Sequence, residues 1–339
     1  MNYIVFKNEN ALYYECGYSC DNALFLKLGK ESFFITDGRY ELDAKESIKD
    51  SKVLITNSLL DELAKILKKS KIKKITIDPI HWDIESFNKL KEQVPTKIKF
   101  LANFSHKKRI IKSSNEIKKL KKAVSIGKKS FKDIARAISN LEGSSELDLN
   151  FLAESILRDY GSRDISFEPI LAFAENAAKP HAMPTKRELK VGDLVLLDAG
   201  VKYKRYCSDR TRTAYFNGDL EFNIKQKFAS KKIQKAYDTV LKAHDVAIKK
   251  AKSGMKAKQI DKLARDVIEK AGFGKYFVHS TGHGVGLDIH EMPYISSKSD
   301  TIIEDGMVYT IEPGIYIEGE FGIRIEDVVV MQNGKAKVL

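Results

Sequence analysis

The sequence contains few cysteines and no long apolar run. Only Cys16, Cys20 and Cys207 occur among 339 residues, and a small, odd number argues against a disulfide framework. No window approaches the roughly 18 apolar residues of a membrane-spanning helix, and the opening MNYIVFKNEN does not resemble a signal peptide. We therefore expect a cytoplasmic protein without a membrane partner, long enough for two domains.

Acidic residues are also in deficit. The chain has 59 lysines and arginines against 46 aspartates and glutamates, a net charge of +13. The lysine-rich run 118–129 lies within a segment whose apolar residues recur at helical spacing, so its lysines are expected on a solvent-exposed helix face. No aromatic residues alternate with the basic ones. The charge therefore indicates solubility, and a nucleic-acid partner is not expected.

Residues 1–110 are predicted to form a small α/β domain. The basic stretch near 105–114 has little apolar periodicity and marks its end, which leaves 113–339 for the second domain. Aromatic and apolar content indicates strands in the first domain, and helical spacing indicates helices. The predicted strands are 11–18, 23–29, 32–38 and 72–78, and the predicted helices are 39–48 and 58–70.

The second domain repeats one pattern at a period of about 110 residues, too long for a solenoid. In each half, two helical segments precede an apolar strand, which ends in a carboxylate followed two residues later by glycine. These strands lie in 190-KVGDLVLLDAG-200 and 303-IEDGMVYTIEPG-314. A site between two related halves would receive equivalent residues from each. The predicted helices are 115–140, 145–160, 223–252 and 256–271.

The first half contains a predicted hairpin in 195–216. A turn at Tyr203-Lys204 would place Asp198 opposite Asp209. Facing side chains on antiparallel strands lie about 5 Å apart. Two carboxylates at that distance destabilise each other unless a proton or a cation lies between them.

The second half repeats the arrangement, because a turn at Gly319 would place Glu312 opposite Glu326. Four converging carboxylates predict divalent metal. With one added imidazole they suit two ions about 3.5–4 Å apart that share bridging carboxylates. The ligand types favour Mn²⁺, with Co²⁺, Zn²⁺ and Fe²⁺ as alternatives.

The imidazole is expected from 279-HSTGHGVGLDIHEMPYI-295, which contains His279, His283 and His290. This segment lacks the glycine spacing of a phosphate-binding loop, and nothing after Gly286 resembles the helix that such a loop would open. Its glycines also exclude a helical HExxH zinc site. Three histidines so close together in a glycine-rich context indicate a functional site.

The second domain resembles the pita-bread metallopeptidases, a group of methionine aminopeptidases, Xaa-Pro aminopeptidases and prolidases. The N-terminal part resembles the creatinase-type domain of the Xaa-Pro branch, through 33–44 and 109–117. The resemblance implies an α/β (α+β) protein: a smaller, ribonuclease H-like N-terminal domain, then a pita-bread fold of two related halves. The matching segments of the second domain are 181-HAMPT-185, 198-DAG-200, 208-SDRTRT-213, 279-HSTGHGVGLDIHE-291, 312-EPG-314 and 322-GIRIED-327.

By this resemblance, five residues hold two metal ions. Asp198 and Asp209 bind one ion, His283 and Glu312 help to bind the other, and Glu326 bridges both together with Asp209. All five ligand positions are filled, which counts against a relative that has lost its metal. A hydroxide bridging the two ions would attack the peptide carbonyl near neutral pH.

The resemblance also implies catalytic residues around the metal. His279 and His290 would hydrogen-bond the substrate carbonyl and the developing gem-diolate. His181 would lie beside the scissile nitrogen, and Arg324 would brace the site. Glu312 would accept the proton of the attacking water and pass it to the leaving nitrogen.

Three positions depart from the pattern that the resemblance implies. Arg205 and Ala174 stand where glycine is usual, and Phe173 where serine is usual. Tyr294 stands where archaeal prolidases resemble one another in having an arginine, which favours an aminopeptidase over a dipeptidase.

The resulting prediction is an Xaa-Pro aminopeptidase that acts on peptides with proline at the second position, and a homodimer. The alternatives are a prolidase and, in another class, a non-catalytic RNA- or protein-binding protein on the same fold.

Overall fold

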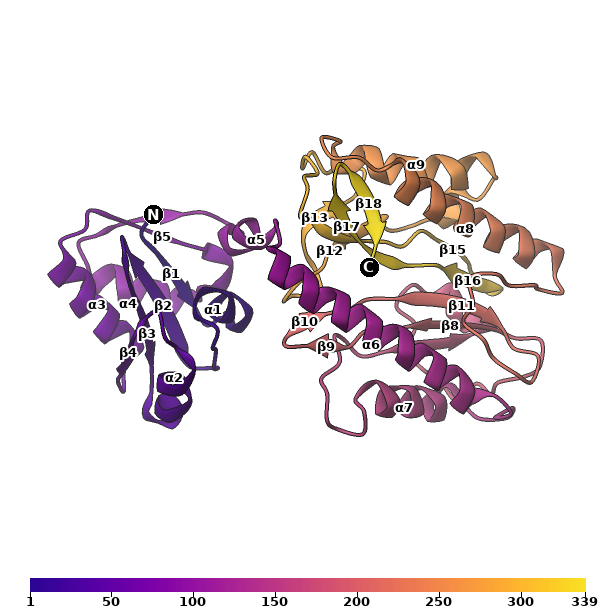
Figure 1. The fold of residues 1–339 in the computed structure, drawn as a ribbon, viewed down its shortest axis with the longest axis horizontal. Coiled ribbons are helices and arrows are strands. Elements are labelled where there is room, and N and C mark those ends of the chain that lie inside the picture. The colour runs from indigo at the N-terminus through magenta and orange to yellow at the C-terminus, as the bar shows by residue number, and fades with distance from the viewer. The chain divides into compact units, whose positions relative to one another are not determined.

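A computed structural model describes residues 1–339, and the chain divides into two compact units, Met1–Arg109 and Ile110–Leu339. We call them the N-terminal and the C-terminal unit and describe each by itself (Figure 1). None of the helices combines the length and the apolar character needed to cross a bilayer.

The N-terminal unit is a small α/β domain. Its elements are β1 (Tyr3–Phe6), α1 (Glu9–Cys16), β2 (Ala23–Leu28), β3 (Glu31–Thr36), η1 (Gly38–Tyr40), α2 (Glu41–Ser47), β4 (Lys52–Ile55), α3 (Leu59–Ser70), β5 (Lys74–Ile77), η2 (Pro79–His81), α4 (Ile84–Gln93), β6 (Lys97–Phe100) and α5 (Phe104–Arg109). A six-stranded sheet has the order β4-β3-β2-β1-β5-β6. β1, β2 and β3 pair antiparallel, and the pairs toward both edges are parallel.

The strand predicted at 11–18 is wrong, because most of this segment belongs to helix α1. The side chain of Asn8 accepts a hydrogen bond from the Ala11 N–H at 2.8 Å, and Gly17 ends the helix in the left-handed conformation at φ 78°. These caps outweigh the strand preference of the aromatic residues, which is weak and depends on context. The other strands and helices predicted in this unit are confirmed.

The C-terminal unit contains two main sheets, in the orders β11-β8-β7 and β13-β12-β14-β17-β18, and the two-stranded ladders β9-β10 and β15-β16. The four helices predicted here are confirmed as α6, α7, α8 and α9, although α8 begins at Lys231, after its cap Ser230, and so eight residues later than predicted. The elements are α6 (Ser114–Ile138), α7 (Glu146–Leu157), β7 (Ile170–Phe173), η3 (Ala174–Ala178), β8 (Leu194–Asp198), β9 (Lys202–Tyr203), β10 (Tyr206–Cys207), β11 (Thr211–Tyr215), α8 (Lys231–Lys250), α9 (Ala257–Lys270), η4 (Gly274–Tyr276), β12 (Gly282–Gly284), β13 (Glu291–Ile295), β14 (Val308–Ile311), β15 (Gly314–Ile317), β16 (Phe321–Arg324), β17 (Asp327–Gln332) and β18 (Lys335–Val338).

Strand β8 is buried on both faces, between two apolar cores. Leu194 and Leu196 pack into the core that contains α8 and α9, whereas Val195 and Leu197 pack into the core that contains α6 and α7. Side chains alternate along a strand, so Asp198 leaves β8 on the same face as Leu194 and Leu196. That face is covered by the second half of the unit, which brings its own acids.

Candidate metal centre

The first acidic hairpin has a register different from the predicted one. Asp198 pairs with Thr211, not with Asp209. The turn lies one residue later than predicted, at Lys204 and Arg205, which both adopt left-handed conformations at φ 48° and 68°. A two-residue turn of this kind matches the twist of the strands. Because a register shift of two residues preserves the face of the sheet, Asp209 still lies on the same side as Asp198.

The second acidic hairpin has the predicted register. Ile311 pairs with Asp327 at the end of one ladder, and Gly314 pairs with Arg324 at the start of the next. Glu312 and Glu326 lie between these two pairs, at opposing positions on the two strands. The prediction for this hairpin is therefore confirmed on both sides of the acidic pair.

The acids of the two hairpins converge on one imidazole. Ligand atoms of Asp209, His283 and Glu326 lie within 4.8 Å of one another. The Nε2 atom of His283 is 3.5 Å from Oδ2 of Asp209 and 3.3 Å from Oε1 of Glu312. Its Nδ1 atom lies 3.1 Å from the carbonyl oxygen of Gly284, a partner that calls for a proton on Nδ1. Nε2 is then left as a lone pair facing the carboxylates, as a metal ligand requires.

Asp198 joins this group with an oxygen that has no partner. Its Oδ2 accepts a hydrogen bond from Arg324 at 2.6 Å, whereas Oδ1 is buried and without a hydrogen bond. Most buried polar atoms are satisfied, so an orphaned carboxylate oxygen requires an explanation. A cation held jointly with Asp209 supplies one, and the donor set of oxygens and one imidazole fits a divalent ion.

The electrostatics of the cluster support the same interpretation. Burial, reinforced by the charges of Glu326 and Asp198, raises the pKa of Asp209 well above its ordinary value. Burial and the neighbouring carboxylates raise the pKa of Glu326 in the same way, and burial raises that of Glu312. Burial lowers the pKa of His283. The protein alone therefore disfavours the charged state of these acids, which a bound cation would stabilise.

Threonine hydroxyls orient two of the acids, and neither threonine stands out as a site residue in the sequence. The Thr211 hydroxyl donates to Glu326 at 2.7 Å, and the Thr310 hydroxyl donates to Glu312 at 3.1 Å. Threonine is common in strands, so neither residue carries a distinctive signal. Thr211 lies two residues after Asp209 and Thr310 two residues before Glu312, a spacing that becomes informative only when the register is known.

A tyrosine links two of the other predicted residues. The Nε2 atom of His279 lies 2.9 Å from the Tyr316 hydroxyl, which also accepts a hydrogen bond from Arg324 at 2.7 Å. The Nδ1 atom of His279 lies 2.8 Å from the Ser280 carbonyl oxygen. Both ring nitrogens of His279 are thus engaged within the protein. Tyr316 was missed at the sequence level because it looks like an ordinary strand residue.

His290 and His181 lie at the border of the cluster. The ring of His290 is 4.3 Å from that of His283, and His290 is exposed. His181 is also exposed, and it follows Pro180, whose carbonyl oxygen accepts a hydrogen bond from Arg324 at 3.1 Å. The structure therefore brings the predicted residues of both halves together around Arg324 and His283.

A buried ion pair anchors the segment that follows His290. Lys112 and Glu291 lie 2.6 Å apart, and both side chains are almost completely buried. A carboxylate atom of Glu291 also lies where a side chain on Gly286 would be placed, 2.5 Å from its ideal Cβ position. The glycine-rich segment thus packs directly against this ion pair.

A separate groove of about 800 Å³ lies on the outside of the unit. It runs along α8 and the end of α9, and its rim includes Lys231, Lys235 and Lys242. None of the metal-centre residues lines it, so it plays no part in the site described above.

Comparisons with known proteins identify the family. Residues 118–333 match the model of metallopeptidase family M24, and residues 2–111 match that of the creatinase/prolidase N-terminal domain. The chain belongs to metallopeptidase family M24. The fold is accordingly the M24 pita-bread fold, preceded by a creatinase-like domain, as predicted.

Individual relatives of this M24 chain agree. An Xaa-Pro dipeptidase from Bacillus anthracis superimposes with a TM-score of 0.91 at 34% identity, covering 99% of this chain and 92% of that one. An X-Pro aminopeptidase from Thermotoga maritima gives 0.88 at 30% identity, covering 99% and 94%. An uncharacterized peptidase of Staphylococcus epidermidis is 43% identical over 227 residues, which are 67% of this chain and 61% of that protein. The match thus spans about three fifths of that curated relative.

Proposed function

We propose that this M24 peptidase is an Xaa-Pro aminopeptidase, which releases the first residue of peptides that have proline at the second position. The observation that carries the peptidase assignment is the convergence of Asp209, His283 and Glu326 beside the orphaned oxygen of Asp198. Tyr294 supports the aminopeptidase over the dipeptidase. It is 45% exposed in β13 and provides no cation for the free carboxylate of a dipeptide.

The residues present fit two divalent ions, with Mn²⁺ as the first candidate. Asp198, Asp209, His283, Glu312 and Glu326 would hold them. Divalent ions in such a site supply a water molecule activated for attack and neutralise developing negative charge. Manganese as the native metal, a homodimeric state and a cytoplasmic location stay predictions.

The other residues bind and orient the peptide. Glu312 takes a proton from the attacking water and returns it to the leaving nitrogen. His290, which is exposed beside His283, donates a hydrogen bond to the substrate carbonyl. We assign this contact to His290 before His279, because both nitrogens of His279 are engaged by Ser280 and Tyr316.

Arg324 fixes the geometry of the site. Its guanidinium binds Asp198, the Tyr316 hydroxyl and the Pro180 carbonyl at the same time. It thereby orients one ligand and the segment that presents His181 to the scissile nitrogen.

Hydrolysis of matched peptides tests the proposal. Metal-stripped protein is reloaded with Mn²⁺, Co²⁺ or Zn²⁺ and assayed on an Xaa-Pro-Yaa tripeptide, an Xaa-Pro dipeptide, Met-Ala-Ser and an N-terminally blocked tripeptide. Metal-dependent release of the first residue from the Xaa-Pro-Yaa tripeptide, with slow turnover of the dipeptide, is expected. Turnover of the dipeptide alone would make the protein a prolidase. Absence of turnover with every metal would overturn the catalytic assignment.

A further inference from the structure

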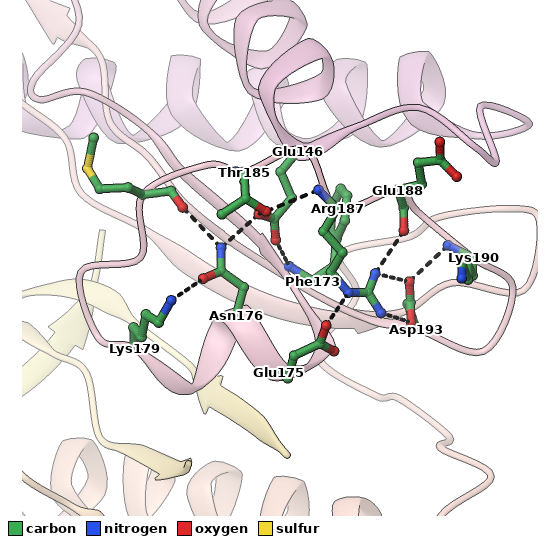
Figure 2. Close-up of polar contacts among 11 residues, drawn as sticks. Glu146, Phe173, Glu175, Asn176, Lys179, Thr185, Arg187, Glu188, Lys190 and Asp193 are labelled. Atoms are coloured by element: carbon green, nitrogen blue, oxygen red, sulfur yellow. Dashed lines mark hydrogen bonds and ion pairs between the residues drawn. The ribbon is translucent and has the colours of Figure 1, made fainter. Parts of the chain in front are cut away.

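A second buried carboxylate, distant from the metal ligands in sequence, holds the segment that carries His181. Glu146, the first residue of α7, is fully buried. Figure 2 shows it surrounded by hydrogen-bond donors from 173–185. Its Oε1 accepts from the Phe173 N–H at 2.7 Å, and its Oε2 accepts from Asn176 Nδ2 at 2.7 Å. Oε2 also accepts from the N–H and the hydroxyl of Thr185, at 2.9 and 2.7 Å.

This arrangement suits a carboxylate and no other side chain of its size. A carboxylate only accepts, and all four partners donate. A buried carboxylate is costly unless it is hydrogen-bonded, and the position of Glu146 at the N-terminus of α7 adds the favourable end of the helix dipole. All four donors belong to 173–185. The geometry that Glu146 determines is therefore that of this segment.

The backbone of α7 and a neighbouring arginine extend the attachment. The N–H groups of Glu146 and Leu147 donate to the carbonyls of Arg187 and Thr185, at 2.9 and 3.1 Å. The Arg187 guanidinium binds Asp193 through two hydrogen bonds of 2.6 and 2.8 Å and also binds a glutamate of η3, as Figure 2 shows. Hydrogen bonds thus hold segment 173–185 at both ends, at Phe173 and at Thr185.

The opposite side of the same segment rests on strand β16. The ideal Cβ position of Gly322 would lie 1.7 Å from the carbonyl oxygen of Ala177, so η3 packs directly on this backbone. Arg324, two residues further, binds the carbonyl of Pro180 at 3.1 Å. His181 follows at once. The histidine is therefore presented from a segment fixed between Glu146 and the strand that leads to the metal-centre acids.

We infer that Glu146 is a positioning residue of the peptidase: through 173–185 it sets His181 at the mouth of the metal centre without contacting metal or substrate. The inference rests on the proposed function for the role of His181. The hydrogen bonds to Glu146 hold the segment in place before any substrate arrives. The entropy of ordering it is then not lost when a peptide binds.

Glu146→Gln tests the inference, because it turns one acceptor into a donor that faces the N–H groups of the segment. A misplacement of about 1 Å caused far from the chemistry can cost about 100-fold in rate, so kcat/KM for the Xaa-Pro-Yaa tripeptide is expected to fall at least tenfold. The metal content should stay unchanged. Glu188→Gln is the matched control: it is the same substitution at an exposed residue that contributes only its backbone carbonyl to the network. Its kcat/KM should stay within about twofold of the wild type.

A double-mutant cycle separates positioning from a general loss of structure. If Glu146 acts through His181, the loss caused by Glu146→Gln should largely disappear in a His181→Ala background. Additive losses, or loss of metal from Glu146→Gln, would overturn the inference. Should Glu146→Gln fail to fold, Thr185→Val removes one donor with little change of shape and enters the same cycle.

Hydrogen exchange keeps the inference separate from the proposed function. If metal-loaded wild-type protein cleaves none of the peptides, the proposed function fails. Backbone exchange of 174–185 then still tests the attachment. Faster exchange there in Glu146→Gln than in Glu188→Gln supports it, and equal exchange overturns it.

Discussion

Buried carboxylates occur in two contrasting settings in the C-terminal unit. At the metal centre, Asp209 and Glu326 face other carboxylates, their pKa values are raised, and an oxygen of Asp198 has no partner. At the start of α7, Glu146 accepts hydrogen bonds from four donors. The first group is incomplete without a cation, whereas the second is complete within the protein.

This difference shows how a buried carboxylate that binds an ion can be told from one that only holds the structure together. Burial alone does not separate the two settings, because Glu326 is 2% exposed and Glu146 is 0% exposed. The balance of donors and acceptors around each carboxylate does separate them. An excess of acceptors indicates a site for an ion, and an excess of donors indicates a structural attachment.

The largest expected effect comes from removing one acid of the metal centre. Outer-shell partners of a metal contribute about 10–100-fold to affinity or activity. Asp209→Asn removes a direct ligand and should therefore reduce kcat/KM more than 100-fold and lower the metal content. Elemental analysis and peptide hydrolysis measure both. Asp219→Asn, at an exposed position, is the control, and full activity in Asp209→Asn would contradict the assignment of Asp209 as a ligand.

The same carboxylate-to-amide change should have opposite effects on metal-free stability in the two settings. The raised pKa of Asp209 means that its contribution to stability is lost as the pH rises above its ordinary value of 3.8. Asp209→Asn should therefore raise the melting temperature at pH 7.5. Glu146→Gln places an NH2 group against the donors that bind this carboxylate, so a buried donor is left without an acceptor. The free energy of unfolding should fall by about 1–3 kcal/mol. Thermal unfolding in the presence of a chelator measures both variants. If their melting temperatures shift in the same direction, the two carboxylates do not differ in the way described.

Gly322→Ala tests the contact between strand β16 and segment 173–185, the segment that Glu146 binds. The added methyl group would meet the Ala177 carbonyl, and overpacking of this kind costs about 1–3 kcal/mol. We expect a lower free energy of unfolding in urea and reduced peptidase activity. Gly38→Ala, where nothing lies within 4 Å of the added atom, is the matched substitution. Equal stability of the two variants would show that η3 does not rest on β16.

Metal uptake should be coupled to proton release at the acid-rich centre. Carboxyls with a raised pKa, at Asp209, Glu312 and Glu326, retain protons to higher pH, and a metal ion must displace those protons. His283, whose pKa is lowered, has no proton to release near neutral pH. Affinity should therefore rise with pH, about tenfold per unit for each proton displaced. Calorimetry at pH 6 and pH 8, in buffers of different ionisation enthalpy, measures this, and equal affinities would contradict the raised pKa values.

The smallest expected effect concerns the turn of the first hairpin. Arg205 adopts a left-handed conformation at φ 68°, which costs a non-glycine residue about 1–2 kcal/mol. Glycine loses about 0.5–1 kcal/mol more entropy on folding. Arg205→Gly should therefore stabilise the protein by up to about 1 kcal/mol, as measured by chemical unfolding. Lys202→Gly, in the adjacent strand β9, should destabilise the protein. If both glycine variants change the free energy of unfolding in the same direction, Arg205 is not strained.

Much of the fold and the residues of the candidate site could be predicted from the sequence. Helices α6 to α9 follow from apolar spacing, and the second acidic hairpin has its predicted register because Gly319, at φ 71°, marks the turn. The first hairpin has no such mark. Arg205 occupies a turn position without the residue type that identifies one, so the predicted pairing was displaced.

The amino-acid sequence specifies which residue types are available and the local periods that form helices and strands. It therefore supplied the acids and histidines of the metal centre. Their partners emerge only from the folded chain: Thr211 for Asp198, Tyr316 for His279, and Thr185 for Glu146. These partners lie 13, 37 and 39 residues apart. Local spacing carries no information at the two longer separations, where packing within each half chooses which donor meets which acceptor. The pairing of Asp198 was decided by the turn at Lys204 and Arg205.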